Sequence, residues 1–138
     1  MKIRLDDVMQ SVSFPVHASY YYYIPLETVL MFISGAIYGK SVDGISSEKD
    51  VLKHPDKFLK LPGIGEEGRE KVMMSFISSL EDEAVRVRLR EAAEKGMQYF
   101  EGMLTEERLL IRWLNYRDGI YMEFSRRWIL DHGLELIE

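Results

Sequence analysis

The chain contains no cysteine among its 138 residues, which excludes a disulfide framework and thiolate chemistry. Its three histidines, His17, His54 and His132, are scattered without metal-binding spacing, so we expect neither a metal site nor a cofactor. No serine lies in a G-x-S-x-G sequence, and hydrolase chemistry therefore lacks a local motif. No apolar run is long enough to cross a bilayer, and the first residues lack the apolar core of a signal peptide. We expect a cytoplasmic protein that makes no contact with a membrane.

What is present is the composition of a folded globular protein. Hydrophobic residues make up 46% of the chain and charged residues 30%, and the length suits a single domain over residues 1–138. The formal net charge of −5 argues against a general affinity for nucleic acid or for an anionic membrane surface.

The strongest pattern predicts one long amphipathic helix from Thr105 to Gly133. At about 100° per residue, one arc of this helix is apolar and the opposite arc is polar. The apolar arc consists of Leu110, Trp113, Leu114, Ile120, Tyr121, Phe124 and Trp128. Thr105 is expected to cap the first turn and Gly133 to follow the last one. Arg117 falls inside the apolar arc while Asp118 points away from it, so we expect the partner of this guanidinium on another element.

The remaining patterns predict an α+β fold, in which a small antiparallel sheet of two or three strands packs against four or five helices. The long C-terminal helix is expected to be the central strut. Ala18 to Ile24 and Val29 to Ile33 are expected to form a hairpin, with Phe58 to Leu61 as an ambiguous third strand. Pro15 is expected to end the first helix, and Ser41 to Lys49 to form an exposed loop. The expected shorter helices are Leu5 to Ser13, Gly35 to Lys40, Glu66 to Leu80, Asp82 to Lys95 and Gln98 to Leu104.

Four consecutive tyrosines, Tyr20 to Tyr23, lie in the first strand of the hairpin. Alternate rings must point to opposite faces of the sheet. One pair is expected to enter the core, and the other to line a shallow pocket or an interface, where tyrosine is favoured. The sequence does not decide which pair is which.

The segment from Leu61 to Gly68 supports three interpretations. Its G-x-G-x-x-G pattern is that of a dinucleotide loop, but no βαβ unit surrounds it and Glu66 and Glu67 would repel a phosphate. It also resembles the hairpin of the helix-hairpin-helix DNA-binding family, an alternative that these carboxylates and Pro55 disfavour. The favoured interpretation is a structural loop before a helix. The residues that would contact nucleic acid in the second interpretation are Gly63, Ile64, Gly65, Arg69 and Lys71.

The order of motifs along the whole chain resembles uncharacterised protein family 0158, small bacterial proteins of unassigned function. Trp113-Leu114-Asn115-Tyr116-Arg117-Asp118 is similar to that family's W-Y-x-F-R-D, and further matches lie at Lys2 to Asp7 and at Phe58 to Pro62. The chain departs from the family at Glu94 to Glu101, where relatives tend to carry an arginine-rich stretch. The resemblance implies a fold and no activity.

Two roles are open for Arg117. In the favoured structural role it forms a buried ion pair with Asp6 or Asp7. In the functional role it lies in a pocket that binds a small acidic ligand or serves as the active site of a small enzyme. The expected lining of this pocket is Arg117, Trp113, Tyr121, Tyr20 and Tyr22. We therefore predict a non-enzymatic binding or regulatory domain that acts on another protein, on a second copy of this chain or on a small acidic ligand.

Overall fold

The computed structural model of the protein describes residues 1–13 and 18–137, so the predictions made for Pro15 and His17 lie outside the described residues. Its contacts divide the chain into two compact units. The first, here called the sheet unit, comprises residues 1–65 and 121–138, and the second, the helical unit, comprises residues 66–120. Cooperative folding of the whole chain as one domain stays a prediction, which unfolding measurements would test.

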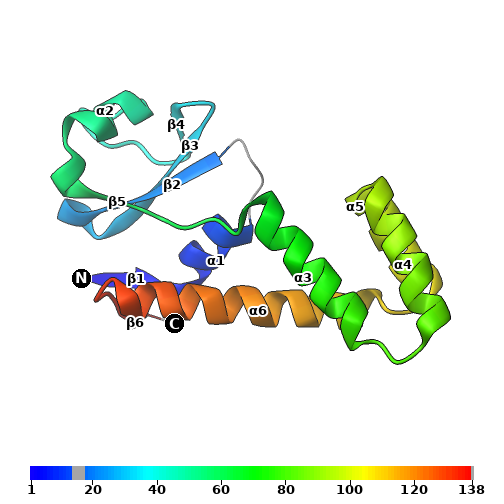
Figure 1. The fold of residues 1–138 in the computed structure, drawn as a ribbon. Coiled ribbons are helices and arrows are strands. Elements are labelled where there is room, and N and C mark those ends of the chain that lie inside the picture. Colours follow the sequence, from blue (N-terminus) through cyan, green and yellow to red (C-terminus); the bar gives the residue numbers. More distant parts are fainter. Residues whose placement is uncertain (14–17, 138) are drawn as a thin grey trace. The chain divides into compact units, whose positions relative to one another are not determined.

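A four-stranded antiparallel sheet in the order β4-β3-β2-β5 forms the centre of the sheet unit (Figure 1). The predicted hairpin is confirmed by the pairing of β2 (Ala18–Tyr23) with β3 (Thr28–Ile33). The ambiguous third strand is β5 (Phe58–Lys60), which pairs antiparallel with β2. The sheet has four strands rather than the two or three expected, because β4 (Ala36–Tyr38) extends it beyond β3.

The additional strand replaces the helix predicted over Gly35 to Lys40, and the reason is the turn before it. Ser34 and Gly35 have φ angles of 51° and 86°. Two successive positive φ angles between paired strands are typical of a type I′ hairpin turn, whose second position glycine occupies without strain. Ile33 pairs with Ala36 directly across this turn. The two-residue turn therefore returns the chain into the sheet rather than into a helix.

Apolar side chains are buried on both faces of the sheet, and helices lie against it on both sides (Figure 1). On one face Val51 of α2 (Glu48–Lys53) packs with Tyr21, Leu30 and Phe32. The short 3₁₀ turns Ile24–Leu26 and Pro55–Lys57 flank β2 and β5. On the other side lies α1 (Leu5–Ser13), a helix confirmed over its predicted range. The segment predicted as an exposed loop carries α2 from Glu48 onward, so that loop ends earlier than expected.

A second sheet joins the two ends of the described chain. β1 (Lys2–Arg4) pairs in parallel with β6 (Glu135–Ile137), and the backbone N–H of Glu135 donates to the carbonyl of Met1 at 2.8 Å. Neither strand was predicted from the sequence. Each has only three residues, which is too short for an alternating pattern to be recognised.

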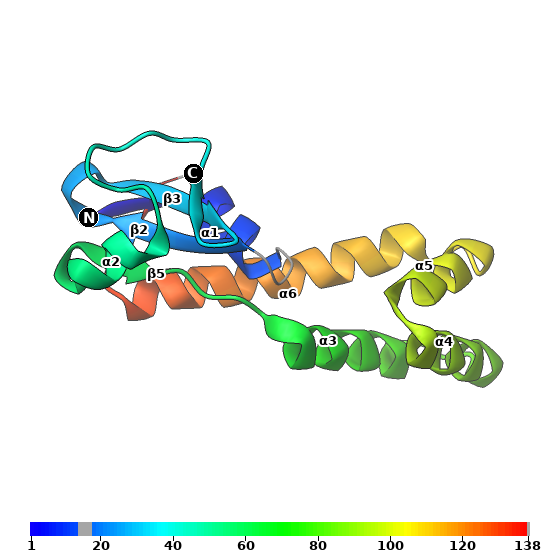
Figure 2. The same cartoon turned by 90° about the horizontal axis from the view of Figure 1, so that it is seen from above.

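The helical unit contains α3 (Gly65–Ser79), α4 (Glu83–Lys95), α5 (Met97–Glu106) and the first half of α6 (Leu110–Asp131). α5 folds back on α4 (Figure 2). The predicted inward face of α3 is confirmed, since Val72, Met73, Phe76 and Ile77, as well as Leu80 just beyond it, are buried. The α+β fold class is confirmed, and the long C-terminal helix is present. Among the described residues, no helix combines the length and apolar character that crossing a bilayer requires.

The long helix begins later than predicted. Thr105 does not cap it, because its hydroxyl donates to the carbonyl of Glu101 inside α5 at 2.9 Å. The chain turns at Arg108, whose φ is 59°, and α6 starts two residues later. The predicted end is confirmed, since Gly133 follows α6 with a φ of 67°, a conformation that glycine adopts at little cost.

The apolar arc of α6 is narrower than the wheel predicted. Ser125 and Ile129 are buried with Tyr121, whereas Phe124 is 38% exposed. The Ser125 hydroxyl is satisfied by donating to the carbonyl of Tyr121 at 2.7 Å. The buried positions are thus four residues apart. Ser125 was not predicted to be buried, because a helical wheel considers only the residue type and not the local hydrogen bond that satisfies a buried hydroxyl.

Candidate functional site

A hollow in the helical unit lies between α4 and α5, which the local sequence sets up as a helical hairpin. The Asp82 carboxylate caps α4 by accepting from the backbone N–H groups of Ala84 and Val85 at 2.9 and 3.2 Å. Gly96 alone separates the two helices. One face of the hairpin is anchored in the core by the buried side chains of Leu89, Phe100 and Leu104. The opposite face is left to solvent.

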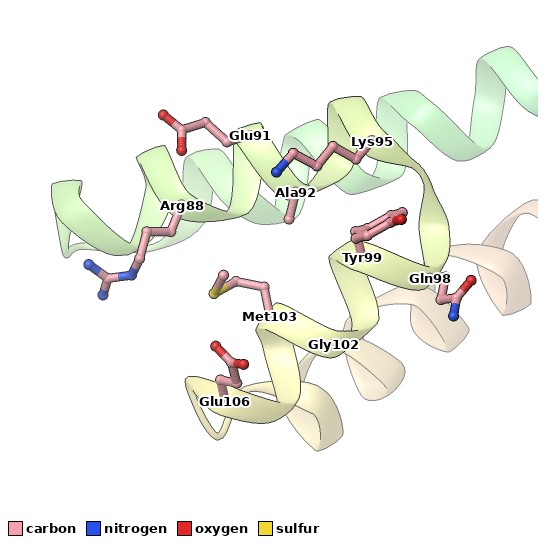
Figure 3. Close-up of a pocket in the computed structure, with 9 residues that line it drawn as sticks. All are labelled: Arg88, Glu91, Ala92, Lys95, Gln98, Tyr99, Gly102, Met103 and Glu106. Carbon is pink, nitrogen blue, oxygen red and sulfur yellow. The ribbon is translucent and has the colours of Figure 1, made fainter.

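An open groove of about 530 Å3 runs between the two helices on this exposed face (Figure 3). We call it the α4–α5 groove. Its lining residues are Arg88, Glu91, Ala92 and Lys95 from α4, and Gln98, Tyr99, Gly102, Met103 and Glu106 from α5.

The floor of the groove is apolar and its walls carry charge. Ala92 and Met103 point into the space between the helices (Figure 3). Gly102 adds no side chain, and a Cβ placed there would meet nothing within 4 Å. Tyr99 lies at the end near the α4–α5 junction, and Arg88 and Glu106 lie at the other end (Figure 3). The Lys95 side chain extends from the junction back along α4, so that its ammonium lies beside Ala92 (Figure 3). Tyr99 and Glu106 are seven residues apart on one helix, which makes the groove about 10 Å long.

One of the two cations of the groove is already paired. The Arg88 guanidinium donates through Nε and Nη2 to Glu107 Oε1, both at 2.8 Å, and so ties α4 to the end of α5. Within the part of the chain that the structure describes, the side chains of Lys95 and Glu106 take part in no ion pair or hydrogen bond. The groove therefore offers an ammonium group on its α4 wall and a carboxylate on its α5 wall.

The core of the helical unit contains Trp113, a predicted ligand-binding residue. Its ring packs edge-on against Phe76 and Phe100, with centroids 5.3 and 5.2 Å away. The side chain has no exposed surface, and its indole N–H has no hydrogen-bond partner among the described residues. Trp113 is therefore part of the packed core in this structure rather than an exposed ligand-binding surface.

Arg117 is only partly buried, with 32% of its side chain exposed. Its Nε and Nη2 donate to Asp118 Oδ1 at 3.1 and 3.0 Å. Asp118 is exposed, as expected, but it is nevertheless a partner of Arg117, because a guanidinium on a long stem reaches the neighbouring carboxylate along the helix surface. An additional pair with Asp6 or Asp7 stays a prediction. Arg117 does not line the α4–α5 groove.

The three tyrosines predicted near Arg117 belong to the sheet unit, whereas Arg117 itself belongs to the helical unit. Tyr20, Tyr22 and Tyr121 are 5%, 0% and 3% exposed. The Tyr22 hydroxyl donates to the carbonyl of Lys2 at 2.8 Å. Burial raises the pKa of Tyr20, and burial together with the Glu27 carboxylate raises that of Tyr22. The common pocket of these residues stays a prediction.

Tyrosine side chains are buried or partly buried on both faces of β2, and which pair lines a pocket or an interface stays a prediction. On the second face the rings of Tyr21 and Tyr23 lie 6.3 and 4.9 Å from that of Phe58. The Tyr21 hydroxyl donates to Glu48 Oε2 at 2.9 Å. Burial, with this bond and the negative charge of Glu48, raises the pKa of Tyr21 to about 12.

The loop proposed for nucleic acid has a structural role in the sheet unit. The backbone N–H of Ile64 donates to the carbonyl of Val12 at 3.1 Å, and the Ser11 hydroxyl donates to the carbonyl of Pro62 at 2.8 Å. Gly63 packs close to the end of α1, where a Cβ would lie 4.0 Å from the carbonyl oxygen of Ser11. A helix-hairpin-helix motif would need the Ile64 amide free for a phosphate and a helix before the loop, but the preceding element is the strand β5.

The positive charges of the two basic residues in the nucleic-acid alternative, Arg69 and Lys71, are also compensated by neighbouring glutamates. Lys71 lies 3.6 Å from Glu67 on the exposed side of α3. Arg69 shares its side of α3 with Glu66 and Glu70. Gly65, the last member of the set, starts α3 with a φ of 73°. This surface attracts cations rather than phosphates.

The residues of the α4–α5 groove were missed by the sequence analysis. The available signal was Gly102, a glycine inside a helix-forming segment, which often marks a packing or functional position. Among residues 1–13 and 18–137, no group of three histidine, aspartate or glutamate side chains is arranged to hold a metal ion. In comparisons with known proteins, no family model, no curated protein and no solved structure matched the chain.

Proposed function

We infer that the protein is a non-enzymatic binding domain whose α4–α5 groove takes a short segment of a partner protein. The observation that carries this proposal is the combination of an apolar floor with an ammonium on the α4 wall and a carboxylate on the α5 wall. None of the nine lining residues is a serine, threonine, cysteine or histidine, the side chains that most often act as nucleophile or general base.

The dimensions favour a peptide over a small molecule. Small-molecule sites enclose most of the ligand surface, whereas this groove is open along one side. A length of about 10 Å accommodates roughly three residues of an extended chain. The expected segment has an apolar side chain over Ala92 and Gly102, an acidic residue near Lys95 and a basic residue near Glu106. The exposed Tyr99 ring, at 58%, provides the flat amphipathic surface that is common in protein interfaces.

The test uses the methyl signal of Met103 in protein labelled with ¹³C at the methionine methyl groups. The probe is a blocked five-residue peptide with the central sequence Asp-Leu-Lys, titrated against peptides with Asp-Leu-Asp and Lys-Leu-Lys. We expect the mixed-charge peptide to shift the Met103 signal in a saturable manner and to bind more tightly than either control. Lys95→Gln should weaken it by about two- to fivefold, the usual value of one exposed ion pair.

Gly102→Leu is the decisive variant. The new side chain meets no atom of the protein at its Cβ, and replacing a glycine inside a helix favours the helix, so the variant should fold at least as stably as the natural chain. The leucine side chain should fill the groove and weaken the binding of the mixed-charge peptide by at least tenfold. Gly119→Leu is the matched control, because Gly119 is also helical, exposed and open around its Cβ, but lies in α6. Equal binding by both variants would contradict the proposal, as would a Met103 signal that responds to hexanoate but to no peptide.

A further inference from the structure

A second groove in the helical unit, on the other side of α4, has a different chemistry. It has a volume of about 580 Å3 and lies between α3 and the residues that join α4 to α5. We call it the methionine groove. Its lining residues are Glu66, Arg69, Glu70, Met73 and Met74 from α3, Ala93 and Glu94 from α4, Gly96 at the joint, and Met97 from α5.

Three of the eight methionines of the chain meet in this groove. Met73 is 8% exposed, and Met74 and Met97 are half-buried, so their thioethers form the floor. Methionine is unbranched and polarisable, and it is overused on surfaces that adapt to several apolar side chains. Ala93 and Gly96 leave room beside them. The floor is therefore suited to large apolar anchors rather than to one rigid ligand.

The rim of the methionine groove is acidic. Glu66, Glu70 and Glu94 are exposed, and none of them is in an ion pair within the described ranges. Arg69 is the single cation of the lining. The excess of carboxylates attracts a cationic partner and disfavours an anionic one.

The spacing along α3 matches a helical partner. Glu66, Glu70 and Met74 recur every four residues, so this wall presents one stripe about 12 Å long. That length corresponds to rather more than two helical turns. An amphipathic helix that lays an apolar face into a groove contacts it with anchors at the same spacing.

We propose that the methionine groove binds a basic amphipathic helix of a partner protein, with apolar side chains on Met73, Met74 and Met97 and lysine or arginine side chains against Glu66, Glu70 and Glu94. This site is separate from the α4–α5 groove, and the proposal does not depend on the function proposed for that groove.

The probe is a 14-residue synthetic peptide of leucine and lysine with leucines at helical spacing, compared with its leucine and glutamate counterpart. In protein labelled at the methionine methyl groups, we expect the lysine peptide to shift Met73, Met74 and Met97 in a saturable manner. The glutamate peptide should leave them unchanged. Raising the NaCl concentration from 50 to 300 mM should weaken binding, because exposed charges are screened.

The decisive variant replaces Glu66, Glu70 and Glu94 together with glutamine. We expect the dissociation constant of the lysine peptide to rise by about three- to thirtyfold, which corresponds to three exposed ion pairs. The matched control replaces Glu81, Glu101 and Glu123 with glutamine, which changes the net charge equally at exposed positions outside both grooves.

Three results would overturn the proposal. Equal weakening by the variant and its control would show general attraction between charges. Shifts confined to Met103 would assign the peptide to the α4–α5 groove. Unchanged signals of Met73, Met74 and Met97 at millimolar peptide would show that the methionine groove does not bind such a helix. The reporters are thus different from those of the first proposal, and either proposal can fail alone.

Discussion

The hydrogen bond between Tyr21 of β2 and Glu48 of α2 allows a pH-dependent prediction. Tyr21→Phe removes a 2.9 Å bond to a carboxylate while keeping the ring that packs on Phe32 and Phe58. A hydrogen bond to a charged group contributes about 1.5 to 3 kcal/mol, and we expect a value of about 1 kcal/mol because Glu48 is half-buried and water can replace the hydroxyl. The variant should be less stable by this amount at pH 7.

The sign of the pH dependence follows from the raised pKa of Tyr21. The group titrates near 10 when unfolded and at about 12 when folded, so the folded state binds more protons between these values. Its contribution to stability is complete below pH 10 and is lost as the pH rises towards 12. In this window the natural chain should lose stability more steeply than Tyr21→Phe. The absence of cysteine keeps thiol chemistry out of this alkaline experiment.

The assay is urea unfolding followed by far-ultraviolet circular dichroism at pH 7, 9, 10, 11 and 11.5. Tyr38→Phe is the matched control, because Tyr38 is 59% exposed and its hydroxyl makes no hydrogen bond among the described residues. Its stability curve should be parallel to that of the natural chain. If Tyr21→Phe and Tyr38→Phe have the same alkaline slope, the reasoning about the buried hydroxyl is refuted.

Three further changes test the packing and the helix ends. Trp113→Ala should reduce the free energy of unfolding by about 3 to 5 kcal/mol, because the ring is fully buried, and a loss below about 1 kcal/mol in urea unfolding would contradict this. Ser47→Ala should cost about 1 kcal/mol by breaking the capping box at the start of α2, whereas Ser41→Ala, at an exposed position outside that box, should be neutral in thermal unfolding. Gly133→Ala should lower stability by about 1 kcal/mol because of its positive φ, and Gly119→Ala should raise it by up to about 1 kcal/mol; effects of the same sign in denaturant titrations would contradict the assigned backbone conformations.

The elements that could be predicted from the sequence are those with a full local pattern. α1 and α3 each show several turns of helical spacing, and β2 has six residues rich in tyrosine. β4 was mistaken for a helix because its signal is the pair of φ angles at Ser34 and Gly35, which residue types alone do not reveal. The local residue pattern therefore predicts whether a long element is a helix or a strand. The prediction fails for a short element whose type is determined by the turn before it.

The candidate site could not be predicted for a different reason. The α4–α5 groove exists because Gly96 folds α5 back on α4, and a groove is a property of two faces placed together. Arg117 attracted attention because it broke an apolar pattern, and one of its partners is the next residue in the sequence. The sequence therefore drew attention to Arg117, whose charge interrupts an apolar pattern. It did not reveal the groove, because the facing surfaces of α4 and α5 have no unusual residue pattern.

The pairing of β1 with β6 has a consequence for the order in which the two units can form. Residues 66–120 are continuous in the sequence, so the helical unit can complete its own contacts without either end of the described chain. The sheet unit cannot, because Ile3 pairs with Leu136. Closing a flexible segment of this length costs about 4 kcal/mol of chain entropy. A helical unit that has already folded shortens the flexible segment and lowers this cost, so the middle of the chain helps to bring its two ends together.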